Sequence, residues 1–145
     1  MRLWSRIAVV LAVAFVPLVA SAQFSDLDAA LQNLTRGFGS GDPQAIIAGI
    51  TPGDKVMLQF PGLMTESGFY GRDQAAYLLD GLFNKVHPSA FEQQKVKKEG
   101  AEPQYTITAF WTISVNGKPE TRTLYVQLKK QGDKWAVTSV QSGGK

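Results

Sequence analysis

The sequence contains no cysteine and only one histidine among its 145 residues. Without cysteine, the chain has no disulfide framework and no thiol that could carry a lipid anchor. A structural zinc site takes four Cys or His ligands, so the composition argues against one. We therefore expect a domain that is stabilised by its apolar core alone, with no metal ion and no cofactor.

The sequence also lacks an apolar run of the roughly 20 residues that a membrane-spanning helix needs. The only candidate, Ile7 to Val19, has 13 residues, follows two arginines and precedes the small residues Ala20-Ser21-Ala22. This order is typical of a secretory signal peptide that is cleaved after Ala22. A membrane anchor is the alternative, but the run is too short for one. We expect an exported protein, periplasmic or secreted, with residues 1–22 removed and no membrane association afterwards.

A strong excess of charge is lacking once this segment is set aside. The whole sequence carries a formal net charge of +3, with 15 Lys and Arg against 12 Asp and Glu. Removal of Arg2 and Arg6 leaves 13 against 12, a net charge of +1. Nucleic-acid binding depends on a basic surface, so we expect no nucleic-acid partner.

The remaining sequence begins with two helical patterns. Apolar residues recur at helical spacing between positions 27 and 38, and Ser25 precedes them as a possible capping residue. Asp42 and Pro43 suit the N-cap and the first position of a second helix, because an aspartate oxygen accepts from first-turn amides and proline lacks a donor there. The glycines expected to end the first helix are Gly37, Gly39 and Gly41.

The stretch from Gly68 to Val86 is the strongest pattern in the chain. A short strand at residues 66–70 leads into a helix with Asp73 in its first turn, where the helix dipole favours an acid. The helix should end before His87-Pro88, since proline disfavours helix for the residue ahead of it. Its apolar stripe, expected to be buried, consists of Ala75, Leu78, Leu79, Leu82, Phe83 and Val86.

From Ser89 onward the pattern predicts an antiparallel sheet. The dipeptide Asn116-Gly117 favours a two-residue hairpin turn, which places Val115 opposite Lys118 and makes paired residue numbers sum to 233. Lysines at positions 95, 97 and 98 are typical of a sheet edge, where they prevent pairing with other chains. The strands are expected at residues 91–99, 104–115, 119–130 and 134–141, after an earlier strand at 54–61.

This register decides which side chains share a face of the sheet. One face is apolar and is expected to cover the helices. The other face is rich in threonine but carries two adjacent aromatic residues, and such an apolar patch favours burial against a second copy of the chain. The residues of this expected dimer face are Thr108, Phe110, Thr123 and Tyr125.

Three motifs in this order resemble the nuclear-transport-factor-two-like (SnoaL-like) superfamily of cone-shaped α+β folds. They are Gly41-Asp42-Pro43, the segment from Gly68 to Arg72 ahead of the helix, and Gly132 to Trp135 at the last strand. Within it, Phe83-Asn84-Lys85, Pro88 and Phe91 are similar to a family of small secreted bacterial proteins of unknown function. The resemblance implies an α+β fold with three N-terminal-half helices packed on a curved, mainly antiparallel sheet. It covers one domain, residues 23–141, which leaves 142–145 as a flexible tail.

Candidate catalytic residues are sparse. Enzymes of this superfamily use an Asp or His base inside the cone, and no motif here matches such a site, so we name no catalytic residue. His87 lies at a helix end with no evident orienting partner, and we expect it to cap the helix or face solvent. The row Tyr77, Asp80 and Asn84 is either a small polar site or a solvated helix face.

The residues expected to bind a ligand are Tyr105, Trp111 and Arg122. Trp111 over Arg122 could hold a carboxylate at the mouth of the cone, or the two could be an ordinary cross-strand pair. We expect a non-catalytic binding or interaction domain with a small apolar cone pocket, for a small apolar ligand or a protein partner. The alternative is an acid–base isomerase or dehydratase acting on a small apolar substrate.

We predict that the exported protein begins at Gln23, because the basic start, the short apolar run and Ala20-Ser21-Ala22 together form a cleavable signal. N-terminal sequencing of the exported protein measures this directly. A product that still contained Ile7 to Val19 would contradict both the cleavage and the export of a soluble domain.

Overall fold

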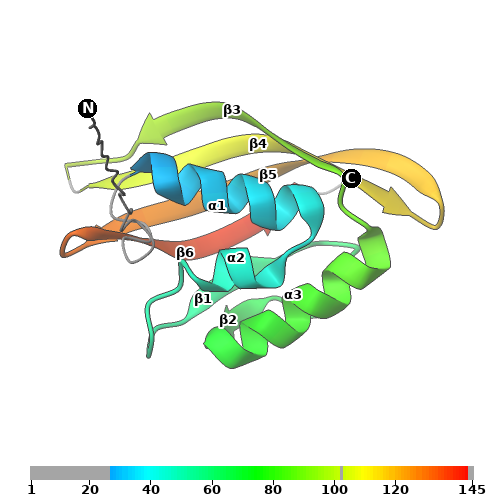
Figure 1. Cartoon of the computed structure of the whole chain (residues 1–145), viewed down its shortest axis with the longest axis horizontal. Coiled ribbons are helices and arrows are strands. Elements are labelled where there is room, and N and C mark those ends of the chain that lie inside the picture. Colours follow the sequence, from blue (N-terminus) through cyan, green and yellow to red (C-terminus); the bar gives the residue numbers. More distant parts are fainter. Residues whose placement is uncertain (1–26, 102, 144–145) are drawn as a thin grey trace, which may run out of the picture.

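The computed structural model describes residues 27–101 and 103–143, so the expected signal peptide and Ser25 lie outside the described residues. Within this part of the chain, three helices and one six-stranded sheet form the fold (Figure 1). The helices are α1 (Leu27–Ser40), α2 (Pro43–Ile47) and α3 (Arg72–Val86). The strands are β1 (Val56–Gln59), β2 (Gly68–Tyr70), β3 (Ala90–Lys98), β4 (Gln104–Val115), β5 (Lys118–Gln131) and β6 (Lys134–Ser142).

The strands follow the spatial order β2-β1-β6-β5-β4-β3. Neighbouring strands are antiparallel, except that β1 runs parallel to β6. The lysine-bearing strand β3 is one edge of the sheet, as predicted, and the short strand β2 is the other. The α+β class and the mixed, mostly antiparallel sheet agree with the prediction from the sequence.

The register of the central hairpin is also confirmed. Val115 pairs with Lys118, and the pairing continues without a shift to Gln104 opposite Lys129. Asn116 and Gly117 have φ angles of 54° and 81°. A type I′ turn needs positive φ at both central residues, which is why this dipeptide fixes the alignment of both strands.

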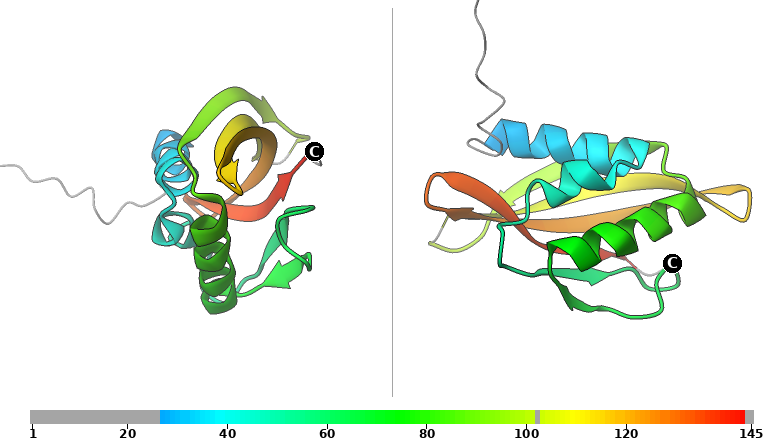
Figure 2. Two further views of the ribbon diagram at one scale, coloured as in Figure 1. Left: turned by 90° about the vertical axis from the view of Figure 1, so that its right-hand side faces the viewer. Right: turned by 60° about the horizontal axis from the view of Figure 1, so that its bottom comes forward.

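The helices lie along one face of the curled sheet (Figure 2). Most of the side chains of β4 and β5 that point toward them are apolar, as the register predicts, and Arg122 and Glu120 are polar exceptions on this face. Five of the apolar side chains are fully buried: Ile107, Ala109, Leu124, Val126 and Leu128. Tyr105, near the start of β4, is half-buried.

The prediction that three glycines end α1 is wrong for two of them. The helix continues through Gly37 and Gly39 to Ser40, and Gly41, with a φ of 72°, follows its end. A Cβ atom on Gly37 would lie 2.5 Å from Cγ1 of Ile46, and one on Gly39 would lie 3.5 Å from the backbone nitrogen of Phe91. Gly37 therefore lets α2 approach α1 closely and is a packing residue, whereas a Cβ on Gly39 would make only ordinary van der Waals contact with β3.

The stripe on α3 is buried as predicted, with one exception. Ala75, Leu79, Leu82, Phe83 and Val86 are buried, but Leu78 is only half-buried. Leu78 lies at the margin of the stripe and faces a surface groove instead of the sheet.

The ends of α3 and β6 refine two further expectations. His87 is the C-cap of α3, in the left-handed region with a φ of 46°, and its amide donates to Phe83 O at 2.9 Å. Strand β6 includes Ser142, which is buried, and Gly143 N donates to Thr123 O at 2.8 Å. The expected flexible tail at 142–145 therefore begins at least two residues too early.

The two helix-interior glycines Gly37 and Gly81 should respond in opposite directions to substitution by alanine. Gly37→Ala should lower the free energy of unfolding by about 1–3 kcal/mol, because the added methyl would overlap the Ile46 side chain. Gly81→Ala should raise it by about 0.5–1 kcal/mol, because a Cβ there meets no atom within 4 Å and alanine favours helix. Urea unfolding of both variants measures this, and changes of the same sign would show that the packing around α1 is misassigned.

Candidate functional site

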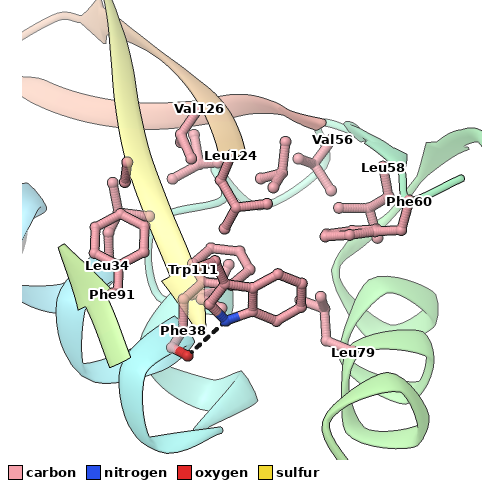
Figure 3. Close-up of a cluster of buried hydrophobic side chains, with 14 of the residues drawn as sticks. Leu34, Phe38, Val56, Leu58, Phe60, Leu79, Phe91, Trp111, Leu124 and Val126 are labelled. Carbon is pink, nitrogen blue, oxygen red and sulfur yellow. Dashed lines mark hydrogen bonds between the residues drawn. The ribbon is translucent and has the colours of Figure 1, made fainter. Parts of the chain in front are cut away.

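The interior between the helices and the sheet is filled by aromatic side chains. Trp111 is fully buried, and its ring centroid lies 5.7 Å from that of Phe38, 5.8 Å from that of Phe60 and 6.3 Å from that of Phe83. Its indole nitrogen donates to Phe38 O at 2.9 Å (Figure 3). Phe91 stacks on the other side of Phe38 at 5.8 Å. The region in which a cone pocket was expected is therefore occupied at its centre by the protein's own rings.

Few polar groups are buried in this interior. Among the described residues, the buried polar or charged ones are Arg122, Ser139 and Ser142, and Ser139, which pairs with Gln127, is on the face of the sheet away from the helices. No acid or imidazole is among them. Such groups are the usual bases for proton abstraction.

Arg122 already has partners within the chain. Its Nη1 donates to Pro61 O at 2.6 Å, and its Nε pairs with the carboxylate of Glu120. Only 7% of the Arg122 side chain is exposed. Glu120 carries no motif that marks it as a site residue, although the hairpin register places it opposite Ile113 on the same face as Arg122. The carboxylate that Arg122 holds in this structure thus comes from two residues earlier in its own strand.

The three residues expected to bind a ligand do not meet at one hollow. Trp111 and Arg122 are cross-strand neighbours, as the register predicts. Tyr105 lies six residues from Trp111 along β4, which corresponds to roughly 20 Å of extended strand. Its ring packs on Trp135, with 5.2 Å between centroids. None of the three lines any of the hollows described below.

The residues of the expected dimer face do lie together. Thr108 pairs with Tyr125 and Phe110 pairs with Thr123, on the face of the sheet away from the helices. Phe110 and Tyr125 are each 43% exposed. The structure therefore places two partly exposed aromatic side chains side by side at the centre of this face.

The largest of the hollows described here is a groove outside the filled core. It lies between α3 and the connection from β1 to β2, and it has a volume of about 560 Å³. Its apolar lining is Leu63, Met64, Leu78 and Leu82, and its polar rim includes Glu66, Gln74, Asp80 and Lys85. Tyr70 and Tyr77 complete it on either side.

Hydrogen bonds fix the wall opposite α3. The amides of Leu63 and Met64 both donate to Phe60 O, at 3.0 and 2.9 Å, which folds the chain into a tight turn after β1. Lys85 Nζ donates to Leu63 O at 3.0 Å and so ties α3 to this wall. The Tyr70 hydroxyl donates to Glu66 O at 3.4 Å.

The groove includes only two members of the polar row Tyr77, Asp80 and Asn84 on α3. Tyr77 and Asp80 line it, and Tyr77 is 78% exposed. Asn84 lies beyond the lining, where its amide donates to Asp80 Oδ2 at 3.5 Å. Two members of the row therefore belong to a groove, and the third supports one of them.

Gly81 is an unusual residue for this position. It lies inside a 15-residue helix, it lines the groove, and a Cβ built on it would meet no atom within 4 Å. Glycine in a helix interior costs roughly 0.5–1 kcal/mol relative to alanine. No neighbour among residues 27–101 and 103–143 requires glycine here, so its effect is to leave the helix backbone open to the groove.

The described part of the chain contains neither a cluster of metal ligands nor a helix that could span a membrane. Residues 27–101 and 103–143 contain no group of three or more His, Cys, Asp or Glu side chains that could hold a metal ion. Over the same residues, no helix is long and apolar enough to cross a membrane.

Comparison with solved structures identifies the fold. A DUF4783 family protein from Bacteroides fragilis is 18% identical, with a TM-score of 0.62 over 78% of this chain and 96% of that one. One from Bacteroides uniformis is 14% identical, with a TM-score of 0.64 over 79% and 95%. An NTF-2 like protein of unknown function from Shewanella oneidensis is 16% identical, with a TM-score of 0.61 over 81% and 96%. At these identities, the likenesses show an NTF2-like fold and confirm the resemblance seen in the sequence.

No curated protein matches the chain. The family model described as Domain of unknown function (DUF4783) matches residues 31–142, which include all three helices and the whole sheet except the first residues of α1. The chain therefore belongs to the DUF4783 family.

Proposed function

We propose that this chain is an exported, non-catalytic binding domain, and that it holds a small, largely apolar ligand in the groove between α3 and the β1–β2 connection. The observation that carries the proposal is Gly81. A helix-interior glycine without a packing neighbour lines the groove, at a cost to helix stability. Glycine is used where a ligand must approach a backbone closely, which gives this residue a purpose that the fold alone does not.

The shape and lining of the groove support the same function. Ligand sites usually enclose about 300–1,000 Å³, with an apolar lining and a few polar groups that fix orientation. The groove, at about 560 Å³, falls in this range, with leucine and methionine in its lining and carboxylates at its rim. We expect the apolar part of the ligand to pack against Leu78 and Leu82, and its polar part to face Asp80 or Glu66.

The chemistry at the groove favours binding over acid–base catalysis. The carboxylates at the groove, Glu66 and Asp80, are both exposed to solvent. The isomerase or dehydratase alternative would need a base inside the cone, where aromatic rings lie instead. Export to the periplasm or the medium remains part of the proposal and rests on the sequence of residues 1–22.

A nuclear magnetic resonance screen of small apolar compounds against residues 23–145 tests the groove. We expect the compounds that bind to shift amide signals of α3 and of residues 61–66. Gly81→Leu should abolish these shifts, because its side chain would occupy the groove. Asn84→Leu adds the same side chain to α3 outside the groove lining and should leave them intact. Shifts that persist in Gly81→Leu, or a screen in which no compound affects the groove, would contradict the proposal.

We also propose that two copies pair through the outer face of the sheet, at Thr108, Phe110, Thr123 and Tyr125. The two aromatic side chains at its centre are partly exposed, and a two-fold axis would bury both against their copies. Phe110→Lys should then dissociate the dimer but leave each domain folded, since the charge of the introduced lysine would face the second copy. Sedimentation velocity at micromolar concentration measures this, with Tyr77→Lys, on the helix side, as the matched control. A monomeric wild-type protein would refute the dimer.

A further inference from the structure

A second hollow lies where α3 begins, and it shares no lining residue with the groove. It is bounded by the loop after α2, residues 48–52, by Arg72 at the start of α3, and by Lys134 and Trp135 at the start of β6. Its volume is about 240 Å³. Since this is below the usual size of a drug-sized site, any ligand held there must be small.

Arg72 brings an unmet hydrogen-bonding requirement to this hollow. Its Nη2 donates to Ile47 O at 3.3 Å, which ties the start of α3 to the end of α2. Its Nε is buried and donates to no acceptor within the described residues. A buried charged donor without an acceptor is costly and calls for a specific explanation. The side chain as a whole is half-buried, and Arg72 lines the hollow.

The two hollows that Arg72 lines differ in the charges of their other lining residues. The hollow toward β6 is lined by Arg72 and by the exposed Lys134, and no acid is among its lining residues within the described chain. A neighbouring hollow, which shares Arg72 and Pro52 with the first, is lined by Lys55 and also by Asp54 and Asp73. An anion is therefore favoured in the first hollow and repelled by two carboxylates in the second.

The start of α3 adds to this preference. Its N-cap is Gly71, which offers no side-chain oxygen to the first-turn amides, so no side chain of the cap residue offsets the positive end of the helix dipole. Asp73, which lines the neighbouring hollow, offsets part of this charge. Arg72 and Lys134 supply the remaining attraction.

The other wall of the hollow is apolar. Ile50 and Trp135 are 2% and 8% exposed, and Pro52 lies beside them. The Trp135 ring is itself held by the Tyr105 ring at 5.2 Å and by Lys130 Nζ at 5.9 Å from its centroid. A bare inorganic anion would leave this wall unused, whereas an organic acid would contact it.

From these observations we infer that the hollow at Arg72 binds the carboxylate of a small organic acid. The guanidinium of Arg72 and the ammonium of Lys134 hold the carboxylate. Arginine suits this role because its planar guanidinium can donate two parallel hydrogen bonds to a carboxylate. The apolar body of the acid packs against Trp135 and Pro52. The site is independent of the groove, so either can exist without the other.

Titration of residues 23–145 with cyclohexanecarboxylate at low salt tests the inference, with signals of the Trp135 indole and the Arg72 Nε–H followed by nuclear magnetic resonance. We expect saturable shifts of both signals. Cyclohexylmethanol, which has a similar body but no charge, should give none, and inorganic phosphate should bind more weakly because it cannot use the apolar wall.

Variants then assign the binding groups. Arg72→Gln should weaken binding about tenfold or more, as the loss of a charge-assisted hydrogen bond implies. Lys134→Gln should weaken it about twofold to fivefold, since this lysine is exposed. Lys55→Gln removes the same charge from the neighbouring hollow and should leave the affinity unchanged.

Three results would overturn the inference. They are the absence of saturable shifts with the carboxylate, equal binding of phosphate and carboxylate, and equal effects of Lys134→Gln and Lys55→Gln. Because Arg72→Gln also loses the hydrogen bond to Ile47 O, its unfolding temperature must be measured first. If that variant unfolds, the comparison of Lys134→Gln with Lys55→Gln decides the question.

Discussion

The contact between Trp111 and the end of α1 is the constraint on which the rest of this fold depends. The last four carbonyl groups of a helix have no partner inside the helix, and in α1 one of them, Phe38 O, accepts from the indole of Trp111. The same indole packs on Phe60, which follows β1, and on Phe83 of α3. A single side chain of β4 therefore satisfies a helix terminus and joins α1, α3 and the sheet. Because it is fully buried, leaving its N–H without an acceptor would be costly.

Local chemistry explains which parts of the fold could be predicted from the sequence. The register of β4 on β5 follows from the two residues Asn116-Gly117, because the turn type fixes the pairing for the length of both strands. The glycines of α1 could not be interpreted this way. Gly37 has the same local signature as a helix end, and only the position of Ile46, brought close by the folding of α2, shows that a Cβ has no room there. Sequence reasoning succeeds where the cause lies within a few residues and fails where it lies across the fold.

The same rule applies to the candidate site, of which less could be predicted from the sequence. Pairing of Trp111 with Arg122 was predictable, but the partners of each side chain were not. Phe38 O and Pro61 O come from segments far away in the sequence, and they turn the pair inward to the core. Glu120 was within reach of the register argument, since it lies on the same face as Arg122 two residues away. The groove could not be predicted, because it exists only where the turn after β1 meets α3, and Lys85 bonded to Leu63 O is what holds them together.

The filled core of this domain and the position of its hollows at the surface have a common cause. A small domain without disulfides depends on buried apolar area for its stability, and here the space that a cone pocket would need is given to Phe38, Phe60, Phe83, Phe91 and Trp111. The two binding sites that we propose lie outside the core, on residues whose substitution leaves these contacts intact. Gly81 and Arg72 both meet this condition. Each carries a local cost, an open helix backbone in one case and an orphan donor in the other, and neither contributes a side chain to the aromatic cluster. Local costs that the core does not require are expected at functional sites, and in this chain both lie on α3, Gly81 at the groove and Arg72 at the hollow toward β6.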